Sequence, residues 1–218
     1  MKSILVIGMG RFGRQFAERM QELGNDVMVV DKNPEIIDEI AYKFTDSLIG
    51  DCCNEAVLNS LGVNNFDVCF VSIGEDFQAS LEITSLLKDR GASHVVSKAR
   101  GDRQAMLLMK IGADEVVYPE REIAEKLAVR YNSDNIFDFI ELTSEYSIFE
   151  IPCISSWHGK TVAELNVRSK YNVNIIAVKR ENCLSISPGA DYVFAANDHI
   201  IVIGKAADVF KLSGKATS

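Results

Sequence analysis

The sequence feature that most constrains the fold is the hexapeptide GMGRFG at residues 8–13. It follows the apolar run ILVI at residues 4–7 and precedes a helical pattern over residues 12–23. A G-x-G-x-x-G motif between a strand and a helix is typical of a turn that binds the phosphates of a nucleotide. The motif therefore predicts a strand–turn–helix unit at the start of an α/β sheet.

Strand and helix patterns continue to alternate through the first 130 residues or so. Strands are predicted at 3–7, 26–30, 47–49, 68–73, 94–97 and 115–118, and helices at 12–23, 34–44, 55–61, 77–89, 103–111 and 120–130. The strands are apolar and β-branched, as expected for strands that are buried on both faces. The pattern predicts a Rossmann-like, doubly wound parallel sheet.

The regular alternation of strand and helix patterns ends in the last third of the chain. Apolar side chains at 136–142 fall on one helical face, and this segment is predicted to be a crossover helix. Strands are then predicted at 146–154, 174–179, 184–187 and 199–204, and helices at 161–166 and 206–212. The predicted domains are a nucleotide-binding domain at 1–132, a crossover helix or linker at 133–144 and a small α+β domain at 145–218. A domain of about 75 residues has a marginal core, so we expect it to pair with a second copy.

Composition excludes several classes of partner. The formal net charge is −8, with 23 Lys and Arg against 31 Asp and Glu, which gives no general attraction for nucleic acid. No apolar stretch approaches the ~20 residues of a transmembrane helix, and the N-terminus resembles a strand rather than a secretory signal. We therefore expect a cytoplasmic protein. The five cysteines form no C-x-x-C pair and the three histidines lie far apart, so reduced structural thiols are expected.

The glycines and one acidic residue define the predicted nucleotide site. Gly8 would permit the tight turn, Gly10 the close approach of a phosphate, and Gly13 the packing of the helix on the sheet. The helix N-terminus supplies free N–H groups for the anion. Asp31 ends the second strand, 18 residues after Gly13, where its carboxylate would bind ribose hydroxyls. The alternative, a glycine turn used only for packing, does not explain Asp31.

Arg11 adds a forked phosphate donor at the mouth of this helix. In a hydride-transfer enzyme backbone groups usually satisfy the pyrophosphate, so the arginine indicates further phosphate charge; the alternative is a solvated surface arginine. Neither His158 nor His199 has an evident catalytic partner, and no nucleophile or Walker A motif is present. A small NAD(H)-dependent oxidoreductase or an NADH sensor remains the alternative to a non-catalytic nucleotide-binding protein.

Several segments in order resemble the RCK-type regulatory subunits of the bacterial Ktr and Trk potassium uptake systems, and most closely the single-repeat Ktr kind. They are VIGMGRFG (6–13), VVDKN (29–33), SIGEDFQAS (72–80), VSKA (96–99), IGADEVVYPE (111–120) and LNVRSKYNVNIIAV (165–178). The resemblance covers essentially the whole chain. It implies a nucleotide-binding N-terminal lobe and a smaller C-terminal lobe.

The resemblance implies that the N-terminal lobe binds ATP or ADP, with Arg11 at the terminal phosphates and Asp31 at the ribose. Asp51 and Cys52 would flank the adenine. The full implied set is Gly8, Gly10, Arg11, Phe12, Gly13, Asp31, Lys32, Asp51, Cys52, Ile73, Gly74 and Lys98. Ile73 and Gly74 would line the floor, and Lys98 would point toward the nucleotide. Relatives often read Gly-Asp-Ala-Thr where this chain has Gly-Asp-Cys-Cys at 50–53, so a hydroxyl contact to the base is lost.

Two further sites follow from the resemblance. Glu120 would help to hold Mg²⁺ or another divalent cation beside the phosphates, although a carboxylate at a helix start is also ordinary capping. In the C-terminal lobe, Arg168 and Asn174 would contact cyclic di-AMP. Many relatives have Asp where this chain has Asn166, and the alternative interpretation is a buried strand preceded by a surface arginine.

The implied function is that of a gating subunit. Dimers would assemble into an octameric ring beneath a membrane potassium-translocating subunit, peripheral to the inner face of the cell membrane. ATP and ADP would favour different ring shapes through their differential affinities. An RCK ring with no channel partner is a further alternative that the sequence leaves open.

Overall fold

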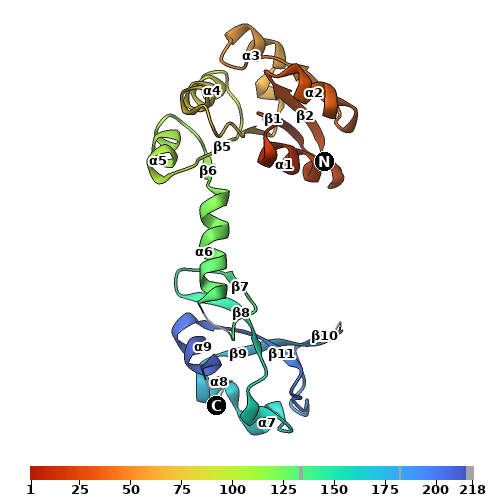
Figure 1. The fold of residues 1–218 in the computed structure, drawn as a ribbon, viewed down its shortest axis with the longest axis vertical. Helices are drawn as coiled ribbons and strands as arrows, with labels where there is room; N and C mark the ends of the chain where they lie inside the picture. Colours follow the sequence, from red (N-terminus) through yellow and green to blue (C-terminus); the bar gives the residue numbers. More distant parts are fainter. Residues whose placement is uncertain (133–134, 182, 215–218) are drawn as a thin grey trace. The chain divides into compact units, whose positions relative to one another are not determined.

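The computed structural model describes residues 1–132, 135–181 and 183–214 and divides into two compact units, Met1–Arg121 and Glu122–Ser218 (Figure 1). The first unit contains a parallel α/β sheet and the second an antiparallel sheet with short helices. The predicted fold class is therefore confirmed. No helix in the described ranges has both the length and the apolar character needed to cross a bilayer.

The first unit is built on six parallel strands in the order β3-β2-β1-β4-β5-β6. The strands are β1 (Ser3–Ile7), β2 (Asp26–Asp31), β3 (Asp46–Ile49), β4 (Val68–Val71), β5 (Val95–Lys98) and β6 (Glu115–Val117). The helices between them are α1 (Arg11–Glu22), α2 (Pro34–Ile40), α3 (Glu55–Leu61), α4 (Phe77–Asp89) and α5 (Asp102–Lys110), with 3₁₀ turns η1 (Ala41–Lys43) and η2 (Val63–Asn65). The strand order reverses between β1 and β4, which opens a crevice at the carboxyl ends of these strands.

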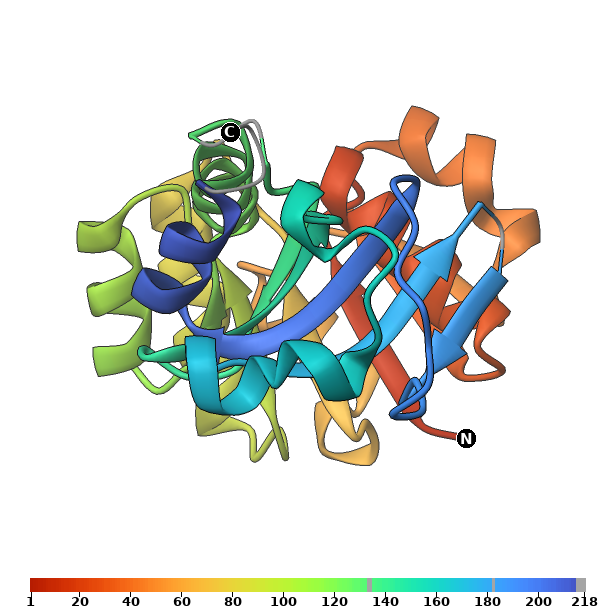
Figure 2. The same cartoon turned by 90° about the horizontal axis from the view of Figure 1, so that it is seen from below.

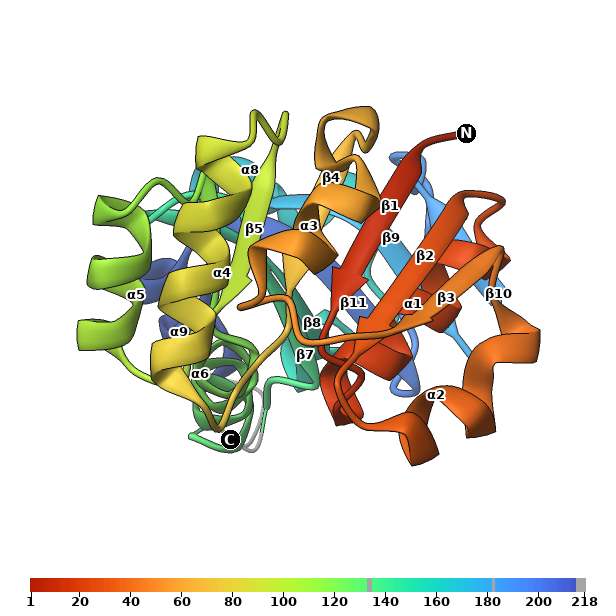
Figure 3. The same ribbon diagram turned by 90° about the horizontal axis from the view of Figure 1, so that it is seen from above.

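The central strands of this sheet are labelled in Figure 3. Side-chain alternation along them divides the core between the two faces of the sheet. Ile4 and Val6 of β1 belong to a buried cluster that includes residues of α1 and α2. Leu5 and Ile7 belong to a second cluster, with residues of α3 and α4. Because both faces are covered, the strands are apolar throughout, as the sequence pattern indicated.

Side-chain caps set where three of these helices begin. Asn33, Asn54 and Asp76 each precede a helix, and each accepts a hydrogen bond from a backbone N–H in its first turn. Such caps satisfy N–H groups that have no partner inside the helix. The helix starts are thereby fixed near the carboxyl edge of the sheet.

Helix α6 (Pro119–Tyr131) begins in the first unit and continues into the second. The second unit has antiparallel strands in the order β10-β9-β11-β8-β7 (Figure 2). They are β7 (Asp138–Glu141), β8 (Tyr146–Pro152), β9 (Asn174–Arg180), β10 (Cys183–Ile186) and β11 (Asp198–Lys205), joined by η3 (Ser155–Trp157), α7 (Val162–Leu165), α8 (Val167–Tyr171) and α9 (Ala206–Ser213).

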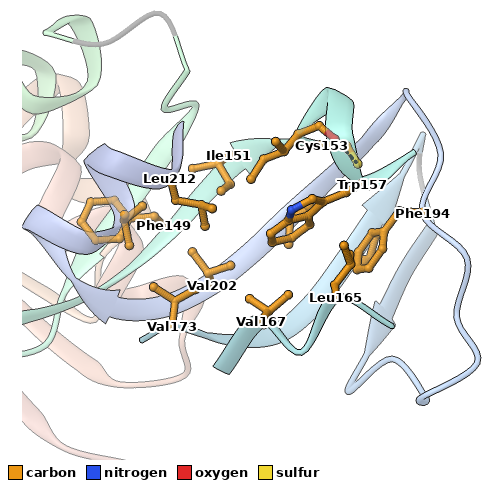
Figure 4. Close-up of a cluster of buried hydrophobic side chains, with 14 of the residues drawn as sticks. Phe149, Ile151, Cys153, Trp157, Leu165, Val167, Val173, Phe194, Val202 and Leu212 are labelled. Atoms are coloured by element: carbon orange, nitrogen blue, oxygen red, sulfur yellow. Dashed lines mark hydrogen bonds between the residues drawn. The ribbon is translucent and has the colours of Figure 1, made fainter. Parts of the chain in front are cut away.

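An aromatic cluster forms the centre of the second unit (Figure 4). Trp157, Phe149 and Phe194 are each 1% exposed, and the Trp157 and Phe194 ring centroids lie 5.5 Å apart. Leu165 of α7 and Leu212 of α9 join the same buried cluster, so these helices cover one face of the sheet. The core residues named here all come from one copy of the chain.

The prediction of a helix at 136–142 is wrong, because residues 138–141 form strand β7, which pairs antiparallel with β8. Ile136 is buried in the unit's core, and Phe139 stacks on Phe149. The neighbouring edge of β8 supplies backbone hydrogen-bond partners for these residues, and the helical spacing of the apolar side chains gives no sign of such partners. Residues 133–134 of the predicted linker lie outside the described residues.

The helix predicted at 161–166 is also shorter than expected. It ends at Leu165, because Asn166 adopts a left-handed conformation with φ of 43°. A second short helix, α8, then begins at Val167 and was not predicted. Asparagine tolerates this conformation better than most residues, which explains the break.

Candidate functional site

A cavity of about 660 Å³ lies at the carboxyl ends of the parallel strands in the first unit. Its lining includes most residues predicted from the sequence: Gly8, Gly10, Arg11, Phe12, Asp31, Lys32, Asp51, Cys52, Ile73, Gly74, Lys98 and Glu120. Gly13 lies outside the lining. The structure thus brings these residues together, while their roles toward a ligand stay predictions.

The glycine turn has the geometry that its three expected roles require. Gly8 has a φ of +93°, and its N–H donates to Val30 O at 2.8 Å. A Cβ on Gly13 would lie 2.1 Å from Gly8 O, so only glycine lets α1 approach the turn. A Cβ on Gly10 would meet no protein atom within 4 Å, which leaves open space beside the backbone. The turn fits a phosphate group that approaches the start of α1.

Asp31 braces the glycine turn directly. Its Oδ2 accepts a hydrogen bond from Met9 N at 2.7 Å, and its Oδ1 accepts one from Asn33 N at 2.9 Å. An ionised carboxylate accepts about four hydrogen bonds, so capacity remains for two ribose hydroxyls. The residue therefore has a structural role that the sequence did not reveal, alongside its predicted ligand role.

The wall beside β3 carries a protonated, neutral cysteine next to the Asp51 carboxylate. Cys52 is 2% exposed, and burial raises the pKa of its thiol to about 12, with the Asp51 carboxylate adding to the effect. Asp51 itself accepts a hydrogen bond from Cys53 N at 3.0 Å. A thiol in this state is neither a nucleophile nor a metal ligand, and it serves as apolar surface.

The opposite end of the cavity carries charge. Lys98, only 8% exposed, donates to Glu120 Oε1 at 2.6 Å, and its Nζ lies 5.7 Å from the centre of the Phe12 ring. This hydrogen bond holds the pKa of Glu120 below its ordinary value. Arg11 is exposed at the start of α1, and its side chain has no hydrogen bond or ion pair within the described ranges. Lys98 is thus committed to a carboxylate, whereas Arg11 is available to an anion.

The sequence-based prediction missed Arg100, which also lines this cavity. Its Nη1 donates to Gly74 O at 3.3 Å. Glu75 and Asp76 of the β4–α4 connection line the cavity as well. The only available signal was position, because all three residues follow the carboxyl ends of buried parallel strands.

A second, smaller cavity of about 260 Å³ lies in the second unit. It brings Arg168 of α8 together with Asn174, the first residue of β9. Val162, Ala163 and Asn166 also line it, and Asn166 is the position where many relatives have Asp. The two residues predicted to contact a cyclic dinucleotide therefore share one hollow.

The remaining polar groups do not assemble a metal centre. Among the described residues, no three His, Cys, Asp or Glu side chains are placed to hold a metal ion. His199 Nδ1 lies 2.7 Å from Glu150 Oε1, a pairing not evident from the sequence, but neither residue lines either cavity. A cation beside Glu120 would therefore need ligand oxygens from elsewhere.

Comparison with known proteins matches the TrkA-N domain model to residues 4–119 and the TrkA-C domain model to residues 147–214. The chain is 40% identical over 208 residues to Ktr system potassium uptake protein C of Bacillus subtilis (strain 168), covering 95% of this chain and 94% of that protein. It is 33% identical over 208 residues to Ktr system potassium uptake protein A of the same organism, with the same coverage.

Among solved structures, the GsuK channel bound to NAD superposes with a TM-score of 0.69 at 17% identity. The match covers 99% of this chain and 39% of that chain. At this identity the likeness shows the fold alone.

Proposed function

The chain belongs to the TrkA/KtrA family of RCK-type potassium uptake proteins, and we propose that it is their nucleotide-sensing regulatory subunit, binding ATP and ADP in its N-terminal unit. One observation carries the choice of ligand. The cavity over the glycine turn has cationic side chains from Arg11 at the turn and from Lys98 and Arg100 at the end away from Asp31, in addition to Lys32 beside Asp31. Guanidinium and ammonium groups suit phosphate oxygens.

The same end of the cavity argues against NAD(H) as the preferred ligand. A dinucleotide with its adenosine ribose at Asp31 would place its second nucleoside beyond the turn, near β4 and β5. In this chain that region carries the acidic residues Glu75, Asp76 and Glu120 and the cations Lys98 and Arg100. A terminal phosphate can bind to the two cations, whereas an uncharged ribose and a flat aromatic ring cannot.

A divalent cation fits the proposal only together with the nucleotide. Glu120 supplies one carboxylate, and phosphate oxygens supply hard ligands of the kind that Mg²⁺ prefers. Lys98 neutralises Glu120 at 2.6 Å in this structure. We propose that a phosphate competes for Lys98 and so frees Glu120 for the cation.

Helix α6 supports self-association. None of its residues is buried, and Ile123, Leu127 and Tyr131 recur on one helical face with exposures of 57%, 41% and 76%. An apolar stripe of this kind is stabilised by packing against a partner. We propose that it contributes to a homodimer, that dimers assemble into an octameric ring, and that the ring acts at the inner face of the membrane on a potassium-translocating subunit.

The cavity of the second unit supports a second ligand, cyclic di-AMP. Arg168 offers a charged phosphate donor, and Asn174 offers an amide that can bond to phosphate or base. At about 260 Å³ the hollow suits part of such a ligand, with a second copy of the chain supplying the rest.

Calorimetric titration of ATP, ADP and NADH in the presence of Mg²⁺ tests the ligand. We expect ATP and ADP to bind more tightly than NADH, and Arg11→Ala to weaken ATP more than ADP. Arg19→Ala is the matched control, because Arg19 is exposed on the same helix and lies outside the cavity. Tightest binding of NADH, together with unchanged ATP affinity in Arg11→Ala, would instead favour the redox interpretation.

A further inference from the structure

We propose that Arg100 is a second phosphate-binding arginine, which lets the site distinguish a nucleoside triphosphate from a diphosphate. The inference rests on the proposed function and adds to it a residue that determines specificity. Arg100 follows the end of β5 by two residues and lines the same cavity as the glycine turn.

Its side chain reaches inward across the sheet edge. Nη1 donates to Gly74 O at 3.3 Å, and Gly74 follows β4, the strand next to β1. A Cβ on Gly8 would lie 3.3 Å from Ile73 N, so Gly74, the next residue, lies close to the glycine turn, and the contact brings the guanidinium toward that turn. A guanidinium has five N–H donors, and one long bond to a neutral carbonyl leaves most of them for a ligand.

Gly74 marks the place where Arg100 comes close to Lys98. A Cβ at that position would lie 3.4 Å from Arg100 Cδ and 3.8 Å from Lys98 Nζ. Two cationic side chains therefore converge on one point of the cavity wall. Lys98 is neutralised by Glu120, but Arg100 forms no ion pair with any carboxylate in the described part of the chain. An anion at this point would bind to the unpaired guanidinium.

The order of strands indicates which phosphate that anion is. Asp31 ends β2, the glycine turn follows β1, Gly74 follows β4 and Arg100 follows β5. A nucleotide with its ribose at Asp31 and its first two phosphates over the turn directs a third phosphate toward β4. ADP ends at the turn, whereas ATP extends into the reach of Arg100.

The test compares Arg100→Gln with Arg103→Gln in the full chain. Arg103 is an exposed arginine on α5, three residues away and outside the cavity, so it controls for loss of surface charge. Calorimetric affinities for ATP, ADP and AMP, with Mg²⁺, are measured alongside the melting temperature. We expect Arg100→Gln to weaken ATP by about tenfold or more and ADP by less than about threefold, with melting unchanged. Arg100→Lys keeps the charge but loses the forked donor geometry, so its affinity for ATP should fall between those of wild type and Arg100→Gln.

Each outcome bears on a different claim. If wild type fails to bind ATP, the proposed function itself fails. If wild type binds ATP and ADP but Arg100→Gln matches Arg103→Gln, or weakens both nucleotides equally, Arg100 does not read the third phosphate and the inference is overturned. A lower melting temperature without a change in the ATP-to-ADP ratio would assign Arg100 to holding the β4–α4 connection, which also overturns it.

Discussion

Gly10 and Gly13 of the glycine turn lead to a quantitative prediction, because they face different surroundings. In Gly13→Ala, the new Cβ would start 2.1 Å from Gly8 O, and real Cβ contacts essentially never fall below 3.0 Å. Either α1 or the turn must therefore move by about 0.9 Å. The turn resists, because Gly8 N is bound to Val30 O and Asp31 is bound to Met9 N.

Overpacking of this kind costs about 1–3 kcal/mol, and the constrained backbone places Gly13→Ala at the upper end. For a unit of this size, about 3 kcal/mol corresponds to a melting temperature lowered by about 10 °C. Gly10→Ala is the matched control. Its Cβ would meet nothing within 4 Å, and its φ of −65° suits alanine, so melting should stay within about 3 °C of wild type.

Differential scanning calorimetry distinguishes the two variants, and addition of ATP identifies the transition of the first unit because a ligand stabilises the unit that binds it. Gly10→Ala should retain its fold but lose at least about tenfold in ATP affinity, because the methyl group occupies the space beside the turn. A Gly13→Ala variant that melts within 2 °C of wild type would refute the packing argument. A Gly10→Ala variant with normal ATP affinity would show that no phosphate approaches that backbone.

Two other expectations concern charged pairs. Burial alone would raise the pKa of Asp198, but hydrogen bonds from the Arg180 guanidinium, with others, outweigh it and hold the pKa below its ordinary value. Asp198→Asn should therefore cost about 2 kcal/mol at pH 7. This difference should shrink in chemical unfolding as the pH falls below ~4, because the unfolded chain binds the proton before the native state does; a constant difference from pH 7 to 3 would contradict this. Glu120→Gln frees Lys98, so the affinity for ATP without a divalent cation should rise up to about fivefold, and the dependence of that affinity on Mg²⁺ should fall. Calorimetry that shows an unchanged dependence on Mg²⁺ would remove Glu120 from the proposed cation site.

The first unit could be predicted because its signals are local. Caps such as Asn33 and Asp76 mark helix starts within one turn, and buried parallel strands read as short apolar runs. The glycine motif carries its own geometry, since the φ of Gly8 and the close approach at Gly13 both demand glycine. The residues that line the first cavity follow these strands and this turn, so they could be named as well.

What the sequence did not reveal depends on partners distant in the chain. Residues 138–141 became a strand because β8 offered an edge, although their spacing also suits a helix. Glu150 pairs with His199 across 49 residues. Arg100 follows β5, and its guanidinium bonds to Gly74 O in the connection after the neighbouring strand, 26 residues away. Pairings of this kind follow from the packed structure, which no local pattern encodes.

Under the proposed function, discrimination between ATP and ADP must arise where the two ligands differ. A ligand shifts an equilibrium only by its differential affinity for the two states, so contacts at Asp31 and the backbone of the glycine turn, shared by both nucleotides, contribute affinity without discrimination. Glu120 lies in the first turn of α6, and this helix continues past the boundary between the two units. The Lys98–Glu120 ion pair therefore joins the end of β5 to the helix that leads into the second unit. Under this proposal, a third phosphate that took Lys98 from Glu120 would act on the first turn of that helix, whereas a diphosphate would leave the pair intact.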